Sequence, residues 1–150
     1  TKVSTSVMGG STSLLAKMST VPGNAGHLFR SSGKASGANF ERSTNAGTTW
    51  AAVTNVTEVW AWGYGKEAPG QSYPAIYIAG YVSGVWGIWR SIDNCVSWTK
   101  LTDAPLGSFD EIKCVSGDMN GYGTVYIGFH GSGYMYGVET NRNALRLRLH

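Results

Sequence analysis

An internal repeat is the feature of this sequence that most limits its possible folds. The segment FERSTNAGTTWAAVT, from Phe40, aligns without a gap on IWRSIDNCVSWTKLT, from Ile88, at a constant offset of 48 residues. A fixed period of this length indicates one structural unit used more than once. The matching positions are Arg42, Ser43, Asn45 and Trp50 in the first copy and Arg90, Ser91, Asp93 and Trp98 in the second.

A third copy is recognisable in part. YIAGYVSGVWG, from Tyr77, resembles YIGFHGSGYMYG, from Tyr126, in its Tyr-Ile, glycine and aromatic positions. The last recognisable unit ends at Gly137. The chain therefore contains about three repeats.

Each repeat is expected to form a four-stranded antiparallel sheet. In the best-defined copy, strands are predicted at residues 58–65, 73–81, 84–92 and 96–102, with turn residues between them. The 21 glycines supply tight turns, and the 6 Trp and 8 Tyr suit half-buried strands. This pattern predicts an all-β fold of β-propeller blades, in which short four-stranded sheets stand around a central channel.

The repeats divide the chain into five predicted parts. Residues 1–27 are expected to supply outer strands of a preceding blade or a linker. Residues 28–54 form part of a blade, 55–104 a complete blade and 105–137 a closing blade. The tail, 138–150, alternates Leu and Arg in NALRLRLH, which fits an edge strand, a disordered segment or foreign sequence.

The hairpin shared by the first two repeats carries the Asp-box pattern, Ser-x-Asp-x-Gly-x-x-Trp. In this motif the acidic side chain caps turn amides and the Trp packs beneath the turn. STNAGTTW has Asn45 at the acidic position, and SIDNCVSW has Cys95 in place of glycine. A non-glycine residue with positive φ is costly, so Cys95 predicts a local alteration. The residues assigned a structural role are Ser43, Asn45, Gly47, Trp50, Ser91, Asp93 and Trp98.

Two longer segments carry a resemblance to a known family. GYGKEAPGQSYPAIYIAGYVSGVWGIWRSID, residues 63–93, resembles the G-x-G-K-x-A-P-G-x-x-Y-P-A-x-Y pattern of family 74 glycoside hydrolases and the R-S-x-D that follows it. GYGTVYIGFHGSGYMYG, residues 121–137, is similar to the C-terminal end of that family. The resemblance to these xyloglucanases and oligoxyloglucan-releasing enzymes runs from Leu28 to Gly137.

The resemblance implies a β-1,4-glucanase with two seven-bladed propellers and a polysaccharide in the cleft between them. In that family two aspartates act as base and acid of an inverting hydrolysis, and neither lies in the matched segment. We therefore expect no catalytic residue here. An inverting reaction needs two carboxyl groups that face each other across the scissile bond, and no recognisable pair occurs among Asp93, Asp103, Asp110, Glu111 and Asp118.

Aromatic side chains are the candidates for sugar binding, because their faces stack on pyranose rings while polar neighbours bind the hydroxyls. The alternative is that they pack blade against blade, which is the usual role of aromatic residues in a propeller. The predicted partner is a polysaccharide or oligosaccharide. The candidate substrate-binding residues are Trp60, Trp62, Tyr64, Lys66, Trp86 and His130.

Composition argues against several other classes. The net charge is only +3, without a basic run except RLRLH at the end, which is too weak for a nucleic-acid surface. No apolar run reaches the length of a membrane helix. Cys95 and Cys114 lack zinc-ligand spacing and leave open a disulfide or two buried thiols. We expect no cofactor, no metal and no membrane insertion, and a secreted, extracellular location.

Two functions remain open from the sequence. The chain is either the C-terminal propeller portion of a xyloglucan hydrolase, or a non-catalytic propeller module for glycan binding or assembly on a cell or virion surface. Three blades leave exposed sheet edges, which favour pairing with another chain. The expected partners therefore include the rest of a longer propeller chain or partner subunits that complete the ring.

Overall fold

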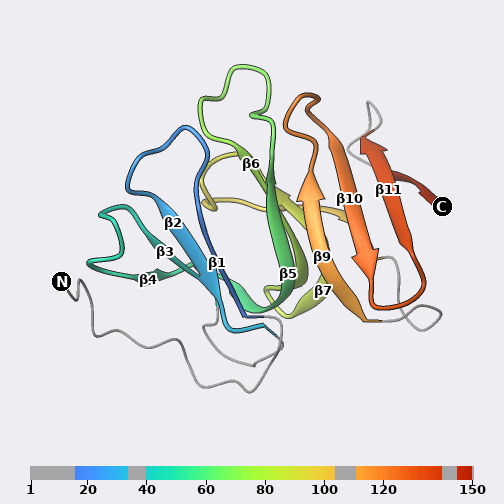
Figure 1. Cartoon of the computed structure of the whole chain (residues 1–150), viewed down its shortest axis with the longest axis horizontal. Coiled ribbons are helices and arrows are strands. Elements are labelled where there is room, and N and C mark those ends of the chain that lie inside the picture. Colours follow the sequence, from blue (N-terminus) through green and yellow to red (C-terminus); the bar gives the residue numbers. More distant parts are fainter. Residues whose placement is uncertain (1–15, 34–39, 104–110, 140–144, 150) are drawn as a thin grey trace.

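The computed structural model describes residues 16–33, 40–103, 111–139 and 145–149, which form three four-stranded antiparallel sheets (Figure 1). The all-β fold of propeller blades is confirmed. The first sheet contains β1 (Lys17–Thr20), β2 (Leu28–Ser31), β3 (Phe40–Ser43) and β4 (Ala51–Ala52). The second contains β5 (Val56–Gly65), β6 (Ala75–Val82), β7 (Val85–Ser91) and β8 (Thr99–Thr102). The third contains β9 (Ile112–Gly117), β10 (Thr124–Phe129), β11 (Tyr134–Glu139) and β12 (Leu145–Leu149).

The first sheet begins earlier than the sequence indicates. Strand β1 pairs with β2, with Lys17 opposite Ser31, so it is the first strand of this blade and not an outer strand of a preceding one. A short turn brings the chain back, because the amide of Val21 donates to the carbonyl of His27 at 2.9 Å. The expectation for residues 1–15 lies outside the described residues.

The third sheet ends later than Gly137. Strand β11 continues to Glu139, and β12 pairs with it, with Gly137 opposite Leu147. Since β12 is the last strand in the sheet order, the described part of the tail is the edge strand that its alternation suggests.

The second sheet lies between the other two and is buried on both faces. Along β6, Tyr77 and Ala79 pack toward the third sheet, whereas Ile76 and Ile78 pack toward the first. Alternation of side chains across a strand produces this division. The fold therefore has two hydrophobic cores, one at each seam between neighbouring sheets.

The first strands of the second and third sheets lie against each other, backbone to backbone. A Cβ atom built on Gly63 would lie 2.2 Å from the carbonyl oxygen of Val115. One built on Gly65 would lie 3.0 Å from the Cα of Gly117. Glycine is required at these positions because no side chain fits between the two strands.

Replacement of Gly63 tests this close approach. We expect Gly63→Ala to destabilise the chain by about 3 kcal/mol or more, because an inserted methyl forces β5 and β9 apart. Urea denaturation measures the change.

Gly121→Ala is the matched control, because its Cβ would meet nothing nearer than the Asp118 carboxylate at 3.6 Å. We expect the control to change the free energy of unfolding by less than about 1 kcal/mol. Equal effects of the two substitutions would contradict the role assigned to Gly63.

Candidate functional site

The hairpin between β3 and β4 is held by two side chains near its start. The Ser43 hydroxyl accepts from the Gly47 amide at 2.9 Å, and Asn45 Oδ1 accepts from the Thr49 amide, also at 2.9 Å. Gly47 has a φ of 81°, and the Trp50 ring lies beneath it. The hairpin is thus stabilised by capping bonds that need a serine and a short amide or acid.

The hairpin between β7 and β8 repeats these bonds. The Ser91 hydroxyl accepts from the Cys95 amide, and Asp93 Oδ1 accepts from the Ser97 amide, each at 2.9 Å. Cys95 has a φ of 65°, the strained conformation that glycine adopts in the other copy. The expected local alteration is nevertheless wrong, because the bonding pattern is unchanged. Burial of the Cys95 side chain in the seam with the first sheet offsets the strain. Trp98 is half-buried and packs against the same core.

Two of the candidate sugar-binding residues are core residues. Trp62 is 1% exposed, and its indole N–H donates to the Ser31 hydroxyl at 2.9 Å. Tyr64 is also buried, donates to the Ser19 carbonyl, and has a pKa raised well above its usual value by desolvation. Phe40 packs edge-on against Trp62. Both side chains therefore pack as core residues and leave little ring surface for a sugar.

Trp60 and Trp86 pack against each other on the other side of the second sheet. Their ring centroids are 4.5 Å apart, and Tyr81 contacts Trp86 as well. Trp86 is buried, whereas Trp60 is only half-buried, and its indole N–H donates to Glu58 Oε1 at 2.5 Å. Trp86 therefore supports Trp60 and has little surface of its own for a ligand.

Lys66 and His130 lie at opposite ends of the strands. Lys66 follows β5, where its ammonium donates to the Asn120 carbonyl at 3.1 Å. His130 follows β10 and is exposed, and its amide donates to the Glu111 carbonyl at 3.0 Å. The six candidates therefore do not form one site.

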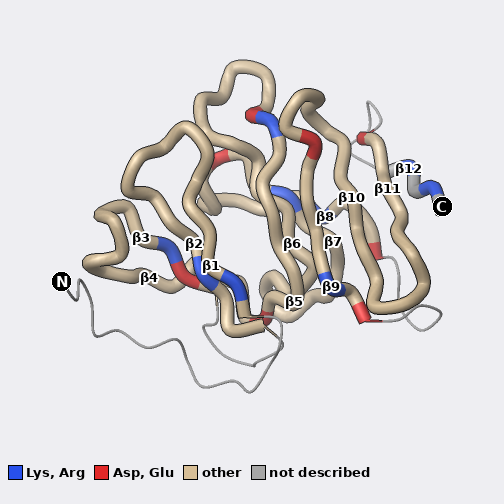
Figure 2. The backbone as a smooth tube through the Cα atoms, in the orientation of Figure 1, with Lys and Arg blue, Asp and Glu red and all other residues tan. Residues whose placement is uncertain are grey.

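A cavity of about 310 Å³ lies where the first strands of the three sheets come together. Lys17, Ala61 and Cys114 occupy the same position in the first strands of the three sheets. Each lies two residues before the residue that pairs with an aromatic residue of the second strand, and these pairs are Ser19 with Phe29, Gly63 with Tyr77 and Ser116 with Tyr126. In Figure 2, charged positions of both signs gather near the starts of β1, β5 and β9. The lining residues are Ala16, Lys17, Trp60, Ala61, Trp62, Lys113 and Cys114.

Hydrogen-bond donors and acceptors surround this cavity. The Lys17 ammonium donates to the Trp62 carbonyl at 2.6 Å and lies 4.4 Å from the indole centroid. Desolvation of that ammonium lowers its pKa, although the residue as a whole is exposed. Lys113 pairs with Glu111 at 2.6 Å. Sequence reasoning missed both lysines, because only the register of distant strands brings them beside Trp60.

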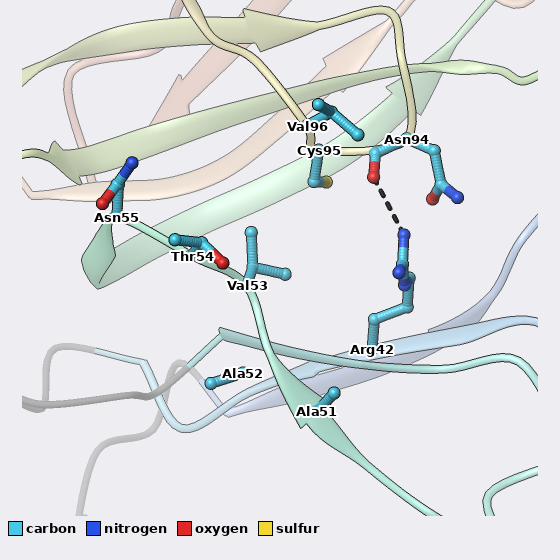
Figure 3. A pocket seen from close by; sticks show the side chains of 9 residues that line it. All are labelled: Arg42, Ala51, Ala52, Val53, Thr54, Asn55, Asn94, Cys95 and Val96. Atoms are coloured by element: carbon cyan, nitrogen blue, oxygen red, sulfur yellow. Dashed lines mark hydrogen bonds between the residues drawn. The ribbon is translucent and has the colours of Figure 1, made fainter.

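A second cavity, of about 320 Å³, lies at the seam between the first and second sheets (Figure 3). Arg42 crosses it and donates to the Asn94 carbonyl at 2.9 Å. Its lining contains no aromatic side chain. Burial raises the pKa of the Cys95 thiol well above its usual value, so this thiol stays protonated and is a poor nucleophile. The seam cavity is therefore a weaker candidate for sugar binding.

The described residues offer neither a disulfide nor a metal site. Both cysteines are free thiols, with Cys95 buried and Cys114 exposed. No group of three or more His, Cys, Asp or Glu in this part of the chain is placed to hold a metal ion. The part that the structure describes also contains no helix long and apolar enough to cross a membrane.

Comparison with known proteins gives consistent matches. The chain is 33% identical over 130 residues to a xyloglucanase of a Paenibacillus species, and 38% identical over 121 residues to the xyloglucanase Xgh74A of Acetivibrio thermocellus. It is a homologue of the GH74 xyloglucanases. The GH74 enzyme of Niastella koreensis superposes with a TM-score of 0.69 at 36% identity over 83% of this chain. The GH74 xyloglucanase of Xanthomonas campestris gives 0.67 at 28% identity over 86%. No family model matches.

The match covers one part of these GH74 proteins. The chain spans 13% and 14% of the length of the two curated relatives, and 18% and 17% of the two solved chains.

The acid at Asp93 gives its hairpin a pH dependence. Burial opposes ionisation, but hydrogen bonds from Ser97 and Ser91 outweigh it and hold the pKa of Asp93 below its usual value. The ionised Asp93 carboxylate therefore stabilises the folded state. This stabilisation is fully present above the unfolded pKa of about 3.9 and is lost as the pH falls through the lower folded pKa. Asp93→Asn should keep the capping bonds, as Asn45 does, and lose less stability between neutral pH and about pH 3.

Urea denaturation at several pH values measures this difference. The reciprocal variant, Asn45→Asp, is the control and should gain an acid-dependent component of stability. An identical pH profile for the wild type and both variants would contradict the role of the capping carboxylate.

Proposed function

We propose that this chain is the C-terminal propeller portion of a secreted xyloglucan-type β-1,4-glucan hydrolase. It supplies cleft wall and sugar subsites, while the catalytic aspartates lie outside these residues. The relatives named as xyloglucanases support the substrate class. The single structural observation that carries the proposal is the cavity at the first strands with Trp60 in its wall.

The groups around this cavity suit a neutral, polyhydroxylated ligand. Trp60 offers an indole surface held by Trp86 and Glu58, so its orientation is fixed before a ligand binds. Lys17 and Lys113 supply donors, and carboxylates nearby supply acceptors. Because Lys113 is paired with an acid, the site has little excess positive charge to favour an anion.

The two hairpins are proposed to be Asp-boxes with a purely structural role. Their capping bonds are made by backbone amides and hydroxyls of the same turn, at the end of the strands opposite the start of β1. Neither Asn45 nor Asp93 is directed at the cavity described above. We assign them no part in binding or hydrolysis.

The role of Trp60 is tested by substitution. We expect Trp60→Ala to weaken the binding of a xyloglucan oligosaccharide at least roughly tenfold, which corresponds to ~1.4 kcal/mol, because a stacking surface is removed. Isothermal titration calorimetry measures the affinity, and circular dichroism checks that the sheets remain.

Trp50→Ala is the matched control for loss of an indole. Trp50 is also half-buried but lies beneath the β3–β4 hairpin, against Arg30. It should leave the affinity unchanged in a folded chain. If Trp60→Ala binds as tightly as the wild type, the sugar surface lies elsewhere. If a neutral oligosaccharide of another linkage binds better than xyloglucan, the substrate class is wrong.

A further inference from the structure

The seam cavity between the first and second sheets holds a positive charge that its lining does not balance. Among the described residues that line it, Arg42 alone is charged. The Cys95 thiol stays neutral because burial raises its pKa. The bond from Arg42 to the Asn94 carbonyl uses one of the five N–H donors of a guanidinium (Figure 3). Within the described part of the chain, no carboxylate pairs with the other donors.

The equivalent arginine of the second sheet shows which group suits this position. Arg42 of β3 lies opposite Phe29 of β2. Arg90 holds the same place in the second sheet, opposite Tyr77 of β6. Arg90 reaches across its seam and forms a buried pair with the Glu139 carboxylate of the third sheet. Arg42 also reaches across its seam, but it meets a main-chain carbonyl there and no acid.

The acid at the matching place in the second sheet is committed to its own turn. Asp93 and Glu139 are equivalent, because each lies three residues after the residue that pairs with the aromatic residue of the second strand. The Asp93 carboxylate accepts from the Ser97 amide at 2.9 Å and from the Ser91 hydroxyl at 2.8 Å. The capping bonds of the hairpin therefore leave Arg42 without the partner that its counterpart has.

The rest of the seam cavity is lined largely by small aliphatic side chains. Val96 lies on the β7–β8 hairpin and is 83% exposed. Ala51, Ala52 and Val53 lie on the segment that faces this hairpin, and both alanines are exposed (Figure 3). The volume of about 320 Å³ is at the lower end of the range found for small-molecule sites. A short hydrocarbon chain would fit this space and cover the exposed aliphatic surface.

We propose that the seam cavity binds a small aliphatic carboxylate, with its carboxylate on the Arg42 guanidinium and its hydrocarbon chain against the aliphatic lining. The Nε and Nη2 atoms of Arg42 form one edge of the guanidinium. This edge can hold a carboxylate by two parallel N–H···O bonds while Nη1 keeps its bond to Asn94. The inference does not rest on sugar binding at the first strands, so either can fail without the other.

Butyrate is the probe for this site, and the native polypeptide that contains these residues is the protein to use. A titration followed by saturation-transfer difference NMR measures its affinity. We expect Arg42→Met to weaken butyrate binding at least roughly tenfold, because the charge and the paired donors are removed together. Circular dichroism checks that the sheets remain.

Two controls separate a specific carboxylate site from general attraction of an anion. Lys100→Met also removes one positive charge, but Lys100 lies outside the cavity lining and pairs with Asp103. It should bind butyrate as tightly as the wild type. Butyramide has nearly the same shape as butyrate without its charge, and it should bind the wild type at least roughly tenfold more weakly.

A second variant keeps Arg42 in place. Val96→Glu adds a carboxylate at an exposed position of the lining, which would occupy the guanidinium and abolish butyrate binding, whereas the uncharged Val96→Gln should still bind it. Equal butyrate affinity of the wild type and Arg42→Met, or equal binding of butyrate and butyramide, would overturn the proposal. Absence of butyrate binding to the native protein would also overturn it, in favour of an acidic side chain from outside the described residues that already pairs with Arg42.

Discussion

The approach of β5 to β9, backbone against backbone, is the constraint on which the arrangement of the second and third sheets depends. Gly63, Gly65 and Gly117 leave no room for a side chain between the two strands. Toward the second and third strands, large side chains such as Tyr77 and Ile88 fill the space between the sheets. The sheets consequently fan out from their first strands, as Figure 1 shows, and most aromatic residues are used to fill the seams.

The blade fold could be predicted from the sequence because its signals are local. The turn residues and the Ser-x-Asn/Asp hairpins act within a few residues of one another, and the repeat shows the same local pattern more than once. The predicted parts of the chain differ from the sheets at places where pairing with a neighbouring strand decides the structure. KMST in β1 is short and mostly exposed, and it becomes a strand only because the turn at residues 21–27 places it beside β2.

The candidate site was harder to predict because the second sheet is buried on both faces. Trp60, Trp62 and Tyr64 lie at every second position of β5. Their residue types alone do not show which ring packs in a core and which faces a ligand. The glycines next to Trp62 and Tyr64 show which way these side chains face. Gly63 and Gly65 face β9, so Trp62 and Tyr64 must face the first sheet. A β-bulge near Trp60 breaks this alternation, and its environment could only be read from the structure.

The two ends of the strands differ in how similar their equivalent positions are. At the hairpin end, equivalent positions carry nearly the same chemistry, serine with serine and Asn45 with Asp93, because the capping bonds tolerate little change. At the starts of the first strands, the equivalent positions are Lys17, Ala61 and Cys114, three unrelated side chains. Repeated units that share turns but differ there can present a different group from each blade. A repetitive fold can thus line an asymmetric cavity without any cost to the turns that define it.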